Sequence, residues 1–209
     1  MKAVVFIDVQ NDFVTGSLGS KWAQEVAPKI IEFANECRDK GYLMYATLDT
    51  HNLSNDDDYS KTLEGKNLPV THCAYGTHGH KLIDGLQFTK DDKKNIYYNN
   101  CINKPTFGSF NLLYALKYDF ESSFPDDNCY LDSYTHPLNP SFGRLGESLD
   151  EIIICGFVTS ICVISNALML RAKFPNVKIT LRSDLCADIN EESHQAALTV
   201  MRNCQINVE

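Results

Sequence analysis

The amino-acid sequence predicts an α/β protein in which helices cover both faces of a parallel sheet. Apolar runs of strand length alternate with segments of helical periodicity along the 209 residues. The clearest run, residues 152–157, is continuously apolar and rich in β-branched residues, as expected for a strand covered on both faces. Because no linker or internal repeat interrupts the chain, we expect a single domain spanning residues 1–209.

The chain begins with an apolar run, residues 3–9, that predicts a buried strand ending in a carboxylate, Asp8. A charge directly behind four large apolar residues is unfavourable unless it has a function there. In open α/β sheets, sites are built at the C-terminal ends of the strands. Residues 22–39 then show helical periodicity, and Gly41 is a plausible end to that helix.

Residues 42–48 predict a second strand, which also ends in an acid, Asp49. A polar connection at 50–80 follows and contains several histidines. A connection of this length within a compact domain is usually functional, so we expect it to contribute to a site.

The remaining elements follow from the same patterns. We expect strands at residues 95–99, 152–157, 177–181 and 206–208, and helices at 111–120, 162–174 and 190–203. Asp184 closely follows the strand at 177–181. Residues 121–146 are rich in Asp, Ser, Pro and Asn, and they predict a loop or a small excursion rather than a regular element.

Composition excludes several classes of function. The net charge is −8 and no basic cluster exists, which argues against nucleic acid or an anionic membrane as partner. Eight cysteines without a Cys-x-x-Cys pair fit reduced thiols in a cytoplasmic protein better than a zinc finger or a disulfide scaffold. The N-terminal apolar run is too short for a signal peptide, and no segment approaches a transmembrane span. No glycine-rich dinucleotide or phosphate-binding loop is present.

Three reactive side chains are predicted near strand ends: Asp8, Lys104 and Cys162. Cys162 stands where a strand gives way to a helix, so the helix dipole is expected to lower the pKa of its thiol. If the strands are neighbours, the thiolate could attack a carbonyl while the carboxylate moves the proton and the ammonium stabilises the thiolate. The alternatives are a cysteine that fills a gap in the core, an acid that caps a loop and a solvated lysine.

A second cluster lies in the polar connection. Asp49 and His51 are two residues apart at the end of a strand, and Glu64 and His72 follow. Mixed oxygen and nitrogen ligands of this kind suit Zn²⁺, Mn²⁺ or Fe²⁺, although an Asp-x-His pair alone is a weak signal. His78 and His80 lie beyond a turn, and we expect both to be solvated.

Five segments with these residues occur in the order of a known family. They are residues 6–13, 48–51, 64–73, 104–107 and 155–162. Together they resemble the isochorismatase-like cysteine hydrolases and, within them, the nicotinamidases. The resemblance covers residues 3 to about 190 except 111–146, which we interpret as an insertion or lid that is atypical of the family.

This resemblance implies a three-layer α-β-α fold with a six-stranded, mostly parallel sheet. It implies a catalytic triad of Asp8, Lys104 and Cys162, with Lys104 holding the thiolate. A non-proline cis peptide would precede Val158, and the backbone amides of Val158 and Cys162 would form the oxyanion hole. One divalent metal, with zinc favoured over manganese or iron, would bind to Asp49, His51, His72 and Glu64, where Glu64 matches a ligand of only one branch of nicotinamidases.

The expected substrate pocket departs from the family pattern at one position. Nicotinamidases hold the substrate ring between two aromatic side chains, and here Phe13 is present whereas Leu68 stands at the second position. Loss of one stacking partner is worth roughly 0.5–1.5 kcal/mol. Phe157, in the turn before Cys162, is assigned to the same pocket. The long segment 121–146 could cover the site or form an oligomer contact, and we expect a homo-oligomer.

The resemblance implies that the chain hydrolyses nicotinamide to nicotinate and ammonia through a thioester and feeds NAD salvage. The metal cluster favours this substrate over carbamoyl or ureido compounds, because relatives acting on those carry the triad without the metal. Another C–N hydrolase acting on a small amide or ureido compound is the first alternative. A non-catalytic binding protein with a vestigial site is the second.

Overall fold

The computed structural model describes residues 1–53, 58–87, 100–120 and 149–209. In these ranges six strands form one sheet in the order β3-β2-β1-β4-β5-β6, and every pair of neighbours is parallel. The strands are β1 Lys2–Ile7, β2 Leu43–Asp49, β3 Cys101–Lys104, β4 Glu151–Phe157, β5 Lys178–Ala187 and β6 Asn207–Val208. The prediction of an α/β fold with a six-stranded parallel sheet is confirmed.

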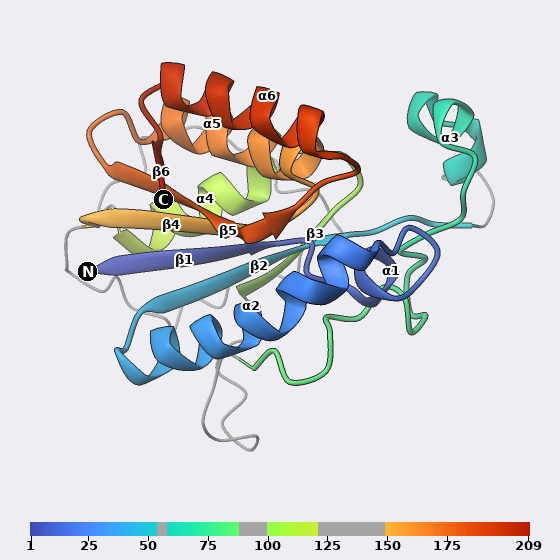
Figure 1. The fold of residues 1–209 in the computed structure, drawn as a ribbon, viewed down its shortest axis with the longest axis horizontal. Helices are drawn as coiled ribbons and strands as arrows, with labels where there is room; N and C mark the ends of the chain where they lie inside the picture. The colour runs from blue at the N-terminus through green and yellow to red at the C-terminus, as the bar shows by residue number, and fades with distance from the viewer. Residues whose placement is uncertain (54–57, 88–99, 121–148) are drawn as a thin grey trace.

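Helices pack on both faces of this sheet. The helices of the described ranges are α1 Asn11–Val14, α2 Lys21–Asp39, α3 Leu63–Asn67, α4 Phe110–Phe120, α5 Ile164–Lys173 and α6 Glu191–Asn203, with short helical turns η2 Tyr59–Lys61 and η4 Thr159–Val163. Helix α2 packs on β5, β4 and β2. Figure 1 shows α5 and α6 side by side on the side of the sheet opposite α2, and α4 packs against α5.

The core lies between the helices and the central strands. Residues 3–7 of β1 are fully buried, and all seven residues of β4 are buried, as expected from its unbroken apolar run. Gly156 allows the two strands to approach closely. Its φ is 126°, and a Cβ atom there would lie 2.1 Å from the carbonyl oxygen of Ile7. Only glycine fits this position.

The strand order reverses between β1 and β4, which are neighbours at the centre of the sheet. In Figure 1 the strand arrows point to the same edge, where α1 and α3 also lie. Loops that follow β1 and β4 diverge at such a reversal and leave room for a ligand. The topology therefore places the expected site beyond the C-terminal ends of β1, β2, β3 and β4.

The fifth strand is longer than the sequence-based prediction, and a strand that was not predicted, β3, completes the sheet. The expected strand at 95–99 lies outside the described residues, and the structure has a strand, β3, at Cys101–Lys104. The register Asp49↔Lys104 pairs the ends of β2 and β3. Strand β5 continues to Ala187, so Asp184 lies inside the strand, where it forms an ion pair with Arg182 at 2.7 Å. Asp188 is the acid that follows β5.

Candidate active site and metal site

Asp8 follows β1 directly and lies at the centre of the candidate site. It is fully buried and has a left-handed φ of 48°, which residues other than glycine rarely adopt. Its Oδ1 accepts a hydrogen bond of 2.7 Å from the Thr47 hydroxyl, and its Oδ2 lies 2.7 Å from Lys104 Nζ. Burial raises the pKa of this carboxyl, and the positive charge of Lys104 opposes the effect.

Lys104 reaches the other groups from the end of β3, with its side chain only 1% exposed. Strand β2 lies between β3 and β1, so the long lysine side chain has to extend across it. Its Nζ lies 3.5 Å from Asp49 Oδ1 and 3.5 Å from Cys162 Sγ. Burial would lower the pKa of Lys104, but the negative charge of Asp8 raises it above its usual value, so the side chain stays an ammonium.

Cys162 lies in η4, a π-helical turn that leads into α5, rather than at the first turn of an α-helix. Its side chain is buried, and its Sγ lies 3.5 Å from Lys104 Nζ. The expected low pKa is wrong for this geometry. Burial, followed by the negative charge of Asp8, raises the pKa of the thiol well above its usual value, although Lys104 opposes this. A raised pKa favours the neutral thiol over the thiolate in this geometry.

The turn between β4 and Cys162 contains the expected cis peptide, between Phe157 and Val158. Asp188 holds this turn from the end of β5. Its Oδ2 accepts from the Ser160 amide at 2.7 Å, and its Oδ1 accepts from the Ser160 hydroxyl at 2.8 Å. Asp188 was not identified from the sequence, because the predicted end of the fifth strand came too early.

Asn166, on α5, is a second residue that the sequence analysis missed. Its side chain is 1% exposed. Its Nδ2 donates to the carbonyl oxygens of Cys162 at 2.8 Å and Phe107 at 3.0 Å, and its Oδ1 accepts from the Ser109 amide at 3.0 Å. One amide thus ties the Cys162 turn to the loop that follows Lys104. No signal in the sequence distinguishes it from a surface asparagine.

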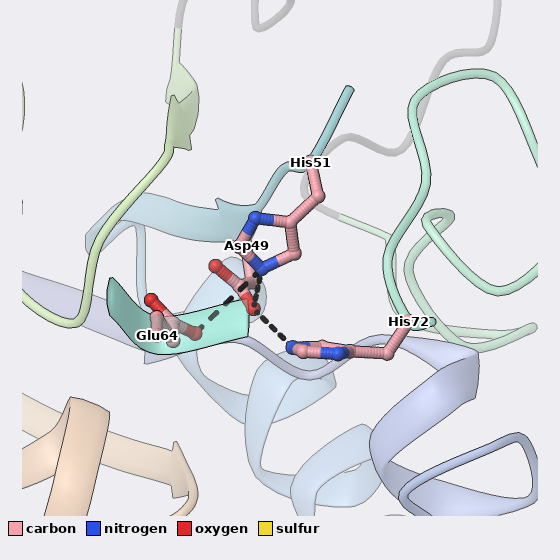
Figure 2. Close-up of side chains that lie close together, drawn as sticks. All are labelled: Asp49, His51, Glu64 and His72. Carbon is pink, nitrogen blue, oxygen red and sulfur yellow. Dashed lines mark hydrogen bonds and ion pairs between the residues drawn. The ribbon is translucent and has the colours of Figure 1, made fainter. Parts of the chain in front are cut away.

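The four expected metal ligands lie close together (Figure 2), and one of them, Asp49, is 3.5 Å from Lys104 Nζ. Donor atoms of Asp49, His51, Glu64 and His72 all lie within 4.8 Å of one another, and they form the one such cluster among the described residues. Asp49 Oδ2 lies 3.1 Å from His51 Nε2 and 3.3 Å from His72 Nε2. Glu64 Oε1 lies 3.8 Å from His51 Nε2. Short helix α3 brings Glu64 to the cluster despite its long separation from His51 in sequence.

The electrostatics of the cluster fit a divalent cation. His72 Nδ1 lies 2.7 Å from the Val70 carbonyl oxygen, which can only accept, so Nδ1 carries the hydrogen and Nε2 presents its lone pair to the cluster. Burial would raise the pKa of Asp49, but the positive charge of Lys104 and the two imidazoles hold it well below its usual range. Burial and Asp49 raise the pKa of Glu64. Two imidazoles and two carboxylates match zinc, manganese or iron.

The three expected pocket residues lie in different surroundings. Phe13 is 6% exposed, and its ring is 6.0 Å from that of His72 in an edge-on arrangement. Leu68 is half-buried at the end of α3, where its carbonyl oxygen accepts from the Tyr59 hydroxyl. Phe157 belongs to the buried core. Their role in a substrate pocket stays a prediction.

His80 and Gln10 correct the interpretation of the polar connection. His80 is buried rather than solvated, and its Nε2 lies 2.9 Å from the Thr50 hydroxyl, whereas His78 is exposed as expected. The Gln10 side chain donates to the carbonyl oxygens of Asp49 and His80 and accepts from the Asp49 amide at 2.7 Å. Gln10 thereby fixes the backbone of the first metal ligand.

Fold and site together define an α/β protein with a buried acid–lysine–thiol cluster next to a potential divalent-metal site. A family model described as Isochorismatase domain matches residues 2–119 and 144–209. The chain belongs to this family and is an isochorismatase-family hydrolase.

Several solved structures have the same fold and align with nearly the whole chain. The nicotinamidase/pyrazinamidase of Bacillus subtilis has a TM-score of 0.70 at 20% identity, covering 99% of this chain and 98% of its own. The pyrazinamidase of Pyrococcus horikoshii, solved in complex with zinc, has a TM-score of 0.68 at 19% identity, covering 100% and 98%. The N-carbamoylsarcosine amidase of Thermoplasma acidophilum has a TM-score of 0.66 at 18% identity, covering 100% and 95%.

No curated protein sequence matches this chain. Each helix in the described ranges is too short or too polar to cross a bilayer.

Proposed function

We propose that this chain is a metal-containing cysteine amidohydrolase that converts nicotinamide to nicotinate and ammonia, and that it acts in the cytoplasm in NAD salvage. The main support for the proposal is that the acid–lysine–thiol cluster contacts the cluster of candidate metal ligands. Lys104 Nζ lies 2.7 Å from Asp8 and 3.5 Å from both Cys162 and the metal-ligand candidate Asp49. A nucleophile and a ring-binding metal could therefore act on the same small substrate.

In the first half of the reaction, Cys162 is the nucleophile and Asp8 is the base. Sγ attacks the amide carbonyl carbon while its proton passes to the Asp8 carboxylate, since both groups lie against Lys104 Nζ. Backbone amides of Val158 and Cys162 stabilise the oxyanion. Asp8 then donates the proton to the amide nitrogen, the C–N bond breaks, ammonia leaves and a thioester remains.

In the second half, water attacks the thioester. Asp8 takes a proton from the water, the C–S bond breaks, and the proton returns to the Cys162 sulfur as the acid leaves. Lys104 keeps its positive charge throughout and holds the Asp8 carboxylate in place at 2.7 Å. The net reaction consumes one amide and one water and releases one acid and one ammonia.

A divalent metal is part of the proposal, with zinc favoured and manganese or iron as alternatives. Asp49, His51, His72 and Glu64 would hold it, as their donor set and spacing allow. When bound, the ion would supply a Lewis acid for a ring nitrogen of the substrate. The zinc complex of the P. horikoshii pyrazinamidase, which shares the fold, supports this choice of metal.

The second candidate is hydrolysis of a carbamoyl or ureido compound. It is favoured by the N-carbamoylsarcosine amidase, which matches the fold over almost the same length. A non-catalytic binding protein is a weaker alternative, because a charged lysine and two buried acids beside a thiol are unfavourable without a function. The proposal also includes three expectations from the sequence. The chain forms a single domain, it assembles into a homo-oligomer, and it has no nucleic-acid or membrane partner.

The decisive experiment measures ammonia release from nicotinamide and from a panel of other amides and ureido compounds, with and without a chelator. We expect release from nicotinamide that stops with Cys162→Ala, falls on chelation and returns with zinc. Cys204→Ala is a matched control, because Cys204 is a half-buried cysteine at the end of α6. Release only from ureido substrates would favour the second candidate, and no release from any substrate would refute the amidase.

A further inference from the structure

We propose that Tyr59 is a positioning residue that holds three of the four candidate metal ligands, His51, His72 and Glu64, in the binding arrangement. This inference rests on the proposed metal site. Tyr59 belongs to η2, within the polar connection, and its side chain is 4% exposed. It is not itself a ligand in the cluster formed by Asp49, His51, Glu64 and His72.

The ring of Tyr59 contacts both imidazoles. Its centroid lies 4.2 Å from that of His51, with the planes tilted by 43°, and 5.2 Å from that of His72, with the planes at 88°. The two imidazoles are themselves 4.7 Å apart. A buried ring packed against both restricts the rotation of each imidazole about its side-chain bonds. The nitrogen atoms that face Asp49 are therefore oriented before a metal binds.

The hydroxyl of Tyr59 acts on the third ligand. It donates a 2.9 Å hydrogen bond to the carbonyl oxygen of Leu68, the residue that ends helix α3. Glu64 is the second residue of this helix, and its own carbonyl oxygen accepts from the Leu68 amide at 2.8 Å. A five-residue helix has little stability of its own, so its position depends on such contacts.

The backbone of Tyr59 holds the other end of α3. Its carbonyl oxygen accepts from the Thr62 hydroxyl at 2.7 Å, and the same hydroxyl accepts from the Gly65 amide at the start of the helix. A Cβ atom on Gly65 would lie 2.0 Å from that carbonyl oxygen, so α3 packs directly on Tyr59. One residue thus fixes both ends of the helix that bears Glu64.

The test compares zinc affinity, measured by chelator competition, in wild-type protein and four variants: Tyr59→Phe, Tyr59→Leu, Glu64→Gln and the double variant Tyr59→Phe/Glu64→Gln. Residues that orient metal ligands typically change affinity by about 10–100-fold. We expect roughly 10-fold weaker binding for Tyr59→Phe, which loses only the hydroxyl, and roughly 100-fold for Tyr59→Leu. Tyr42→Phe, a half-buried tyrosine just before β2, should bind as the wild type does.

The double variant separates positioning from general stability. If the hydroxyl acts through Glu64, Tyr59→Phe/Glu64→Gln binds zinc within about twofold of Glu64→Gln alone. The visible spectrum of the Co²⁺-loaded Tyr59→Phe protein should also shift toward that of Glu64→Gln. Unchanged affinity in Tyr59→Phe, or additive losses in the double variant, would overturn the inference while leaving the amidase proposal intact. Failure of the wild type to bind zinc would instead refute the metal site itself, and with it the role of Tyr59.

Discussion

Replacing Lys104 by methionine tests whether the buried ion pair organises the active site. Lys104 is 1% exposed and lies 2.7 Å from Asp8, which is fully buried. Methionine preserves most of the side-chain volume but removes the positive charge. The Asp8 carboxylate would then be a buried charge with only the Thr47 hydroxyl as a close neutral donor.

The expected loss of stability is large. Breaking one side of a buried ion pair typically costs about 3–5 kcal/mol, because the remaining charge is left without compensation. With a urea m-value of about 2 kcal/mol/M, the unfolding midpoint should fall by roughly 1.5–2.5 M. Total stabilities of domains are about 5–15 kcal/mol, so the variant should remain folded in buffer or be close to the limit.

The assay is urea unfolding at pH 7 of metal-free wild type, Lys104→Met, Asp8→Asn and the double variant. The double variant carries neither charge of the pair. Its loss of unfolding free energy should therefore be smaller, by about 1–3 kcal/mol, than the sum of the losses of the two single variants. Lys40→Met is the control, because Lys40 pairs with Glu36 at the surface, with both side chains more than half exposed. Such pairs contribute less than about 1 kcal/mol. The ion-pair explanation would be refuted if Lys104→Met lost as little unfolding free energy as the control. It would also be refuted if the losses of the two single variants added up to that of the double variant.

Three further predictions concern other parts of the fold. Burial would raise the pKa of Glu151, but hydrogen bonds from Lys178, Lys2 and Thr180 lower it to about 2, so its stabilising contribution is present above about pH 4.5 and is lost as the pH falls toward 2. Glu151→Gln should therefore lower the melting temperature at pH 7 but not at pH 2, and an equal loss at both would contradict this. Asn166→Ala removes the side-chain partner of three backbone groups, two buried and one part-buried, and should cost roughly 2–4 kcal/mol. It should also change the rate at which Cys162 is alkylated by iodoacetamide, whereas Asn207→Ala at the exposed C-terminal strand should change neither. Gly156→Ala, with its Cβ 2.1 Å from the Ile7 carbonyl oxygen, should express as insoluble protein or melt far below the wild type, and near-normal melting would show that β1 and β4 can separate.

Local sequence patterns were sufficient for most of the secondary structure. Continuous apolar runs identified β1 and β4, because a strand covered on both faces has to be apolar along its whole length. The helix predicted at 22–39 is α2 with a shift of one residue at its start. Strand β3 was not predicted, since its four residues are too few to show a periodicity of their own.

Two acids of the candidate site were also visible in the sequence, because charged groups behind apolar runs are unfavourable without a function. Asp8 and Asp49 stood out for this reason. What the sequence misjudged was the state of Cys162. A helix start suggests a low thiol pKa, but the actual burial next to Asp8 raises it.

The sequence by itself determined the fold class and supplied the candidates for the reactive residues and the metal ligands, since these are recognised by residue type at a strand end or in the polar connection. Only the tertiary structure decided how these groups meet. Lys104 reaches Asp8 across β2, and α3 carries Glu64 to the histidines. The supporting contacts of Tyr59, Asn166 and Asp188 likewise join segments far apart in the chain. Such contacts leave no pattern in the sequence, because burial and partner identity arise only when separate elements pack together.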